Sequence, residues 1–167
     1  MGRRDSDADT AFKDAYWGLF VVAYRVARRL LGDEVQAEDV AAETLARTYA
    51  HWNKVGRLSY REAWVAKVAT NAALDILRRK PLDLDVLGAI HQEDAVVTRL
   101  ALVAALRALS RRQREVIVLR YLGGIDVDDI ARSLSISPGS VRSHLQRGLE
   151  HLRDTVGSDA TEKLDAV

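Results

Sequence analysis

Polar side chains with hydrogen-bonding heads cluster within two helical turns near the end of the sequence: Ser140, Arg142, Ser143, Gln146 and Arg147. An arginine can donate two hydrogen bonds to the major-groove edge of guanine, and a glutamine can pair with adenine in the same bidentate way. Serine hydroxyls and a helix N-terminus can hold phosphate oxygens. The cluster therefore predicts a helix face that contacts duplex DNA.

A helix-turn-helix over residues 126–153 would position that face. Asp126 resembles an N-cap for a short helix that ends near Leu134, Ser135 begins the turn, and Ser137 caps the next helix with Pro138 at its first position. The apolar positions suit two crossing helices: Ile130, Ala131, Leu134, Ile136, Val141 and Leu145. An ordinary amphipathic hairpin with a solvated basic face has the same pattern. A positive φ at Ser135 would carry a cost that glycine avoids.

A second group of functional side chains lies in the N-terminal half. An acidic segment is followed by a basic helix, predicted over residues 59–80 with Ser59 and Glu62 as a capping box. The helix carries Asn71, Asp75, Arg78 and Arg79, and three aromatic residues flank Gly56: Trp52, Tyr60 and Trp64. Aromatic rings beside basic groups suit unstacked single-stranded bases. Solvated acids and core aromatics are the alternative interpretation.

These groups require an all-α fold, and the composition favours one, because glycine and proline are scarce. Capping and apolar periodicity predict helices over residues 12–31, 35–51, 59–80, 95–109, 110–122, 126–134 and 137–153. Gly32 is expected to end the first helix, Asp33 to cap the second, and Ser110 with Gln113 to form a capping box. The expected apolar stripe of the second helix is Val40, Ala41, Thr44, Leu45 and Tyr49. We predict two small helical domains, residues 10–80 and 95–155. An acidic linker over residues 81–94 joins them, and a flexible tail covers residues 156–167.

Composition excludes several classes of function. The 167-residue chain has a net charge of +1 and no cysteine, so disulfides and cysteine-based metal sites are absent. The four histidines are scattered, without a carboxylate or serine partner at catalytic spacing. We therefore expect no metal, no cofactor and no enzymatic activity. The N-terminus lacks the apolar run of a signal peptide, and no stretch has the length of a membrane helix, which favours a cytoplasmic protein.

The two groups together resemble a known family. Region 2 of the bacterial sigma-70-family factors is similar to GDEVQAEDVAAETLARTYAHW and the following WVAKVATNAALDILRRK. Region 4 is similar to LSRRQREVIVLRYLGGIDVDDIARSLSISPGSVRSHLQRGLEHLR. Two domains with one linker, and no room for regions 1.1 or 3, resemble the small extracytoplasmic-function (group 4) sigma factors, and the composition looks actinobacterial. The chain departs from the family pattern at Ala41–Ala42, Asp126–Val127 and Ser135.

The resemblance implies an RNA polymerase sigma factor that directs core polymerase to specific promoters. It implies docking on the β′ clamp and β flap, with the clamp facing Asp33, Glu38, Asp39 and Glu43. It implies binding of the melted −10 element by Asn71, Asp75, Arg78 and Arg79. The −35 duplex would be read by Ser140, Arg142, Ser143, Gln146 and Arg147. An anti-sigma factor is a further expected partner.

A different class of protein carries a similar C-terminal pattern. Stand-alone transcriptional regulators also end in a helix-turn-helix domain that resembles residues 110–145 of this chain. In that alternative the N-terminal half would be a sensor or a dimerisation domain. The resemblance to region 2 would then be coincidental, which favours the sigma factor.

Overall fold

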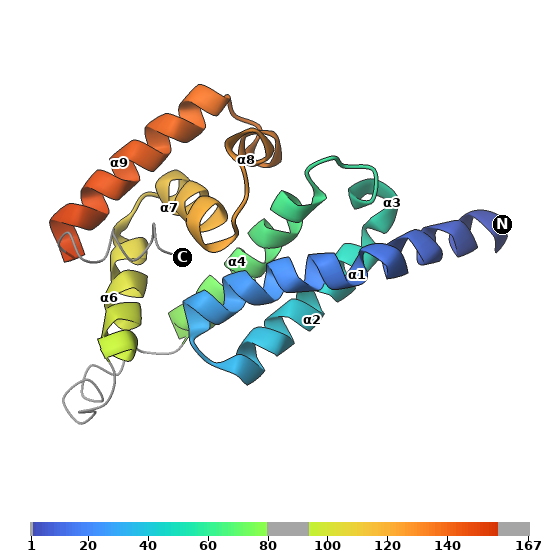
Figure 1. The fold of residues 1–167 in the computed structure, drawn as a ribbon, viewed down its shortest axis with the longest axis horizontal. Coiled ribbons are helices and arrows are strands. Elements are labelled where there is room, and N and C mark those ends of the chain that lie inside the picture. The colour runs from blue at the N-terminus through green and yellow to red at the C-terminus, as the bar shows by residue number, and fades with distance from the viewer. Residues whose placement is uncertain (1, 80–93, 157–167) are drawn as a thin grey trace.

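The computed structural model describes residues 2–79 and 94–156, and it confirms the all-α prediction. These residues form helices and no strand (Figure 1). The elements are α1 (Gly2–Leu31), α2 (Glu34–Ala50), α3 (Trp52–Val55), α4 (Arg61–Arg79), α6 (Asp94–Ala108), α7 (Arg111–Ile117), the π-helical η1 (Val118–Leu122), α8 (Val127–Leu134) and α9 (Pro138–Val156). Apart from Asp94 and Val156, the expected linker and tail lie outside the described residues.

Small residues allow α1, α2 and α4 to pack closely in the N-terminal unit. Alanines with no exposed surface occur on all three helices: Ala23, Ala27, Ala37, Ala41, Ala63, Ala66, Ala69 and Ala73. Larger side chains such as Leu30 and Leu45 fill the remaining core, and burial of each contributes about 1.5–3 kcal/mol. Gly32 ends α1 with a φ of 70°, and the Asp33 carboxylate accepts from the backbone N–H of Gln36 at 2.8 Å. Both boundary signals were predicted, and both are confirmed.

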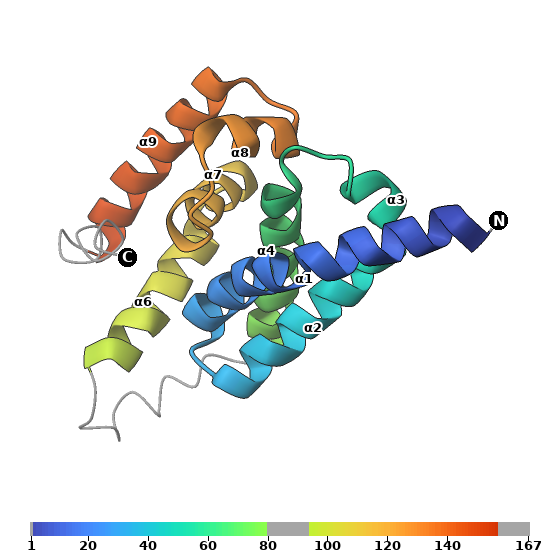
Figure 2. The same cartoon turned by 45° about the vertical axis from the view of Figure 1, so that its right-hand side comes forward.

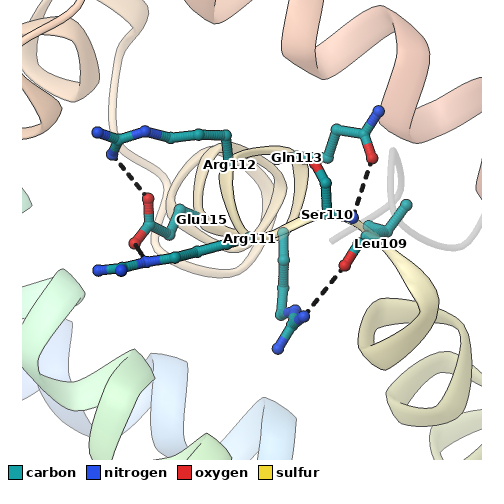
Figure 3. Close-up of polar contacts among 7 residues, drawn as sticks. Leu109, Ser110, Arg111, Arg112, Gln113 and Glu115 are labelled. Carbon is teal, nitrogen blue, oxygen red and sulfur yellow. Dashed lines mark hydrogen bonds and ion pairs between the residues drawn. The ribbon is translucent and has the colours of Figure 1, made fainter.

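Side-chain caps also fix the helices of the C-terminal unit. Ser110 and Gln113 form the predicted capping box at the start of α7 (Figure 3). Asp126 caps α8 through the N–H of Asp129 at 2.8 Å, and Ser137 caps α9 through the N–H of Ser140 at 3.0 Å. Between α8 and α9, Ser135 adopts the left-handed conformation with a φ of 55°. The helix-turn-helix prediction is therefore confirmed, and Ser135 does have the positive φ that is costly for a residue other than glycine.

Several predicted boundaries were wrong. The first helix begins at Gly2 instead of Phe12, and the break expected after Trp52 contains the short α3. Tyr60 and not Ser59 precedes the first residue of α4, and its carbonyl accepts from the N–H of Trp64 at 3.2 Å. The helix predicted through Leu122 does end there, but it changes from α-helical to π-helical geometry at Val118. Local signals place helix ends only to within a few residues, because packing decides the rest.

The two helical units pack against each other. Figures 1 and 2 both place α7 and α8 between α4 and the outermost helix α9. Contacts join α4 to η1 and α8, and join α1 to η1 and α6. Nearly all buried apolar side chains of both units belong to one continuous cluster. In the described part of the chain the two units therefore share one apolar core. We call this packed arrangement the closed molecule.

Candidate nucleic-acid interface

The outer face of α9 carries the residues predicted to read duplex DNA. Arg142, Ser143, Gln146 and Arg147 are exposed. Ser140 is half-buried, and its hydroxyl lies 2.9 Å from that of Ser137. All five lie on α9, which is the outermost helix of the C-terminal unit (Figure 1). Four side chains can thus reach a groove directly, whereas Ser140 serves the helix cap.

The inner face of α9 fixes its orientation. Val141 and Leu152 have at most 1% of their surface exposed. Gly148 lies against α7 so closely that an added Cβ would come within 2.5 Å of Cδ1 of Ile117. Ala131 of α8 is likewise buried where the two helices of the motif cross. A rigid helix with one buried and one exposed face is the arrangement that base recognition in a groove requires.

The acidic residues predicted to dock on the polymerase lie along α2 and just before it. Glu38, Asp39 and Glu43 are exposed, and Glu43 pairs with Arg47 at 2.5 Å. Asp39 and Glu43 are four residues apart and therefore share one side of the helix. Asp33 is also exposed, but its carboxylate caps α2. The structure thus brings three acids together on one helix and gives Asp33 a structural role.

The residues predicted to bind the −10 element lie on α4 and do not all share one environment. Asn71, Asp75 and Arg78 line a hollow of about 480 Å³ between α4 and α7, and Asp75 pairs with Arg78. Arg79 is exposed and does not belong to this lining. The opposite wall consists of Arg111, Arg114 and Glu115. Three of the four predicted residues therefore face the C-terminal unit.

Glu115 was missed as a feature of this hollow. Its side chain is only 8% exposed, and its carboxylate accepts from Arg111 at 3.1 Å and from Arg112 at 2.9 Å (Figure 3). Two arginines satisfy a carboxylate that would otherwise be costly to bury. The sequence signal for these ion pairs is an acidic residue that follows two arginines at distances of three and four positions.

The aromatic residues around Gly56 divide between core and surface. Trp52 is 7% exposed and packs edge-on against Phe12 at 5.0 Å. Trp64 is half-buried and contacts His51. Tyr60 is also half-buried, and the guanidinium of Arg132 lies 5.9 Å from its ring centroid. The Tyr60 ring is therefore already covered by the guanidinium of Arg132, which belongs to α8.

An aromatic row on α1 was not predicted as a feature. Rings four residues apart follow one another along the helix: Phe12, Tyr16, Phe20 and Tyr24. Trp17 is 70% exposed beside them, and Tyr49 of α2 is 50% exposed and donates to Asp9. We expected Tyr49 in the buried stripe of α2, but Thr48 is buried there instead. The four-residue spacing of the rings was the signal that could have revealed the row.

Two kinds of feature are absent from the described residues. Among residues 2–79 and 94–156, none of the helices has the length and hydropathy to cross a bilayer. Over the same ranges, His, Cys, Asp and Glu side chains do not gather into a group of three that could hold a metal ion.

Comparison with protein families assigns both halves of the chain. Residues 21–81 match sigma-70 region 2, and residues 99–152 match sigma-70 region 4. The RNA polymerase sigma-E factor of Streptomyces coelicolor is 32% identical over 136 residues, which cover 78% of this chain and 77% of that protein. The ECF RNA polymerase sigma factor SigL of Mycobacterium tuberculosis is 35% identical over 147 residues, with 81% and 82% covered.

A solved structure has the same fold. The sigma factor RpoE of Bartonella quintana, crystallised in complex with the anti-sigma factor NepR, aligns with a TM-score of 0.59 at 21% identity. The alignment covers 89% of this chain and 98% of that one. The region 2 match removes the basis for a stand-alone regulator with an unrelated N-terminal sensor. The chain belongs to the extracytoplasmic-function sigma factors of the sigma-70 family, the RNA polymerase subunits that direct transcription to specific promoters.

Proposed function

We propose that the two helical units divide promoter recognition between them. Residues 95–155 bind the −35 element as duplex DNA, and residues 10–80 bind core polymerase and the melted −10 element. The exposed polar face of α9, held rigid by its buried opposite face, is the observation that carries this proposal.

In this proposal, α9 lies in the major groove. Arg142, Gln146 and Arg147 contact base edges, and Ser143 contacts the backbone together with the N-terminus of α9. A good bidentate pair discriminates against a wrong base by about 1–3 kcal/mol. Ser140 contributes through the cap that it shares with Ser137, since its side chain is half-buried.

The basic helix α4 holds unstacked bases of the −10 element. Asn71 and Asp75 offer hydrogen bonds to bases, while Arg78 and Arg79 neutralise phosphates. Opening each base pair costs a few kcal/mol, and binding of the extruded bases offsets that cost. Tyr60 adds a ring on which a base can stack.

The exposed acids of α2 bind the clamp of the β′ subunit. Glu38, Asp39 and Glu43 supply negative charge, which accelerates association with a basic partner surface and fixes its orientation. Asp33 supports this surface through the cap of α2. The C-terminal unit contacts the β flap.

The chain performs no bond chemistry in this scheme and needs no cofactor, because the polymerase supplies the reaction. It acts in the cytoplasm, where polymerase and promoters are. An anti-sigma factor controls it, as the pairing in the Bartonella quintana complex suggests by analogy.

Run-off transcription tests the proposal. Purified protein and bacterial core polymerase are incubated with a library of promoter fragments. We expect initiation only on fragments that share spaced −35 and −10 sequences. The proposal fails if the protein neither binds core polymerase in a pull-down nor initiates on any fragment. Tight binding of free protein to a palindromic duplex would instead favour a stand-alone regulator.

A further inference from the structure

One side of α1 lies opposite the core and stays exposed. Residues seven positions apart fall on the same side of a helix, because 3.6 residues make one turn. Residues 7, 14, 21 and 28 have this spacing, and residues 17 and 18 lie between them. Leu19, Val26 and Leu30 are buried on the other side of the helix. We call the exposed set the outer face of α1: Asp7, Asp14, Trp17, Gly18, Val21 and Arg28.

Two large apolar side chains of the outer face are open to water. Trp17 is 70% exposed and Val21 is 49% exposed, and they lie one helical turn apart. The Trp17 ring packs edge-on against Tyr16 at 5.3 Å and against Phe20 at 5.8 Å. These contacts restrain the indole, so a partner that covers it removes little further side-chain freedom. The outer face therefore offers ordered apolar surface whose burial is favourable.

No contact within the described chain requires the glycine at position 18. Glycine is less favourable than alanine inside a helix, and α1 continues on both sides of Gly18. A Cβ added to Gly18 would have nothing within 4 Å, so no neighbouring group excludes a side chain there. Because glycine lets another molecule approach the backbone closely, it leaves a shallow gap in the helix surface beside Trp17. A bulky side chain of a partner fits such a gap.

The charges on the outer face are segregated by sign. Asp7 and Asp14 lie towards its N-terminal end, and Arg28 lies at its C-terminal end. Within the described residues, neither Asp7 nor Arg28 takes part in an ion pair. A helix face that is acidic at one end and basic at the other is complementary to itself when two copies run antiparallel.

An antiparallel second copy also matches the apolar middle of the outer face. If the two-fold axis passes between Trp17 and Gly18, the Trp17 side chain of each copy lies over Gly18 of the other. The same register places Arg28 of each copy opposite Asp7 of the other. A two-fold pair makes every such contact twice, which is the usual form of a homodimer interface.

The shape of the molecule allows this pairing. The first turns of α1 extend beyond α2 and α3 (Figures 1 and 2). From Asp7 to Arg28 the outer face runs about 30 Å along the helix, at 1.5 Å per residue. The projecting end of one copy can therefore lie along the C-terminal half of α1 in the other. A single pair of helices buries little area, which is typical of a weak and reversible dimer.

We propose that the outer face of α1 is a self-association surface, on which a second copy of the chain packs antiparallel with Trp17 over Gly18. The pairing is independent of promoter recognition, since the outer face contains none of the residues proposed to bind DNA or polymerase. Its dissociation constant is on the order of 10 µM, as suits a small interface.

Sedimentation equilibrium of the full-length protein tests self-association. We expect the weight-average mass to rise with concentration from that of one chain towards that of two. Trp17→Ala should weaken the dimer about tenfold or more, because a central buried tryptophan contributes strongly to an interface. Val35→Ala is the matched control, because Val35 is 67% exposed on α2, outside the outer face. It should leave the dissociation constant unchanged.

Gly18→Leu separates a loss of pairing from a loss of folding. The leucine fills the gap that Trp17 of the other copy needs, so the variant should remain monomeric. Its Tm in dilute solution should equal or exceed that of the wild type, because leucine is the better helix former and has open space there. Ala46→Leu adds the same bulk at an exposed position of α2 and should still dimerise.

Charge exchange tests the antiparallel register. Asp7→Arg and Arg28→Asp should each self-associate more weakly than the wild type at low salt, because each places like charges opposite one another. A mixture of these two variants should form a heterodimer, since every facing pair then has opposite charges. High salt should reduce the difference, because these charges are exposed.

A wild-type protein that stays monomeric up to about 100 µM overturns the inference. A dimer that is unaffected by Gly18→Leu also overturns it, because the contact then lies on another face. Failure of the two charge variants to associate when mixed, while the wild type dimerises, shows that α1 does not pair in this register, and the proposed pairing is then wrong.

Discussion

If Gln146 contacts a base of the −35 element as proposed, Glu150 competes with DNA for its side chain. The Gln146 amide donates to the Glu150 carboxylate at 3.1 Å, one turn further along α9. This hydrogen bond occupies one amide N–H and restrains the orientation in which the amide can meet a base edge. An exposed contact of this kind is worth at most about 1 kcal/mol. The carboxylate also repels nearby phosphates, so both effects oppose binding.

Glu150→Ala should therefore tighten binding to a −35 duplex. The loss of a competitor and of a negative charge predicts a gain of about 0.5–1 kcal/mol, or roughly twofold to fivefold in Kd. Fluorescence anisotropy with a duplex from an active promoter measures the change. Asp154→Ala removes the same charge from the same helix at an exposed position, without the contact to Gln146. An equal gain in both variants would mean that only net charge matters.

The acids of α2 allow a second residue-scale prediction. Glu38→Ala/Asp39→Ala should weaken binding to core polymerase about tenfold or more, mainly through slower association, because complementary charge steers encounter. Glu34→Ala is the control, since Glu34 is an exposed acid at the start of the same helix. Surface plasmon resonance with immobilised core polymerase gives both rates. Equal loss in the control would argue against a specific docking surface.

At the scale of the element, sequence predicted best what short-range contacts decide. Asp33, Ser110 and Ser137 were predicted as caps, and each accepts a backbone N–H three residues ahead. The start of α4 was missed by two residues. The π-helical geometry of η1 has no short-range signal that we recognised. The segment η1 packs on α1 and α4 of the first unit as well as on α8, and helix propensity carries no information about such contacts.

The turn between α8 and α9 gives an element-scale prediction. A non-glycine residue in the left-handed conformation costs roughly 1–2 kcal/mol, and Ser135 has a φ of 55°. Ser135→Gly should stabilise the fold by about 0.5–1 kcal/mol after the greater unfolded-state entropy of glycine, and raise Tm by about 1–4 °C. Ser133→Gly is a control that should instead lower the stability of the fold. Ser133 lies inside α8, where glycine costs about 1 kcal/mol relative to alanine.

Differential scanning calorimetry compares the two variants with the wild type. A lower Tm for Ser135→Gly would mean that the serine side chain makes a contact worth more than the conformational strain. The −35 affinity should stay within twofold in this variant, because the glycine keeps the turn geometry that orients α9.

At the scale of the molecule, the sequence predicted two helical units but not their packing. Arg29 is separated from Leu122 by 93 positions, and Arg107 from Leu77 by 30. No periodicity or capping rule links residues so far apart. Arg28 and Arg29 both read as basic residues in the last turn of α1, although only Arg29 has a carbonyl of the other unit within reach. The −10 residues were predicted on α4, but their position against α7 could not be.

A reversible lock between the units gives the whole-molecule prediction. Leu74 and Arg111 line opposite walls of the hollow between α4 and α7, and neither belongs to the proposed DNA-reading or polymerase-docking residues. Leu74→Cys/Arg111→Cys is joined by a bismaleimide that contains a central disulfide. Glu115 keeps Arg112 as its partner in this variant, so its carboxylate stays paired.

The linked protein should lose run-off transcription and regain it on reduction, because linked units cannot span roughly 85 Å of promoter. Binding of the −35 duplex by free linked protein should survive, since α9 lies on the outside of the closed molecule (Figure 2). Each single-cysteine variant treated with the same reagent controls for modification of its wall. Full transcription by the linked protein would show that both promoter elements are reached without separation of α4 from α7.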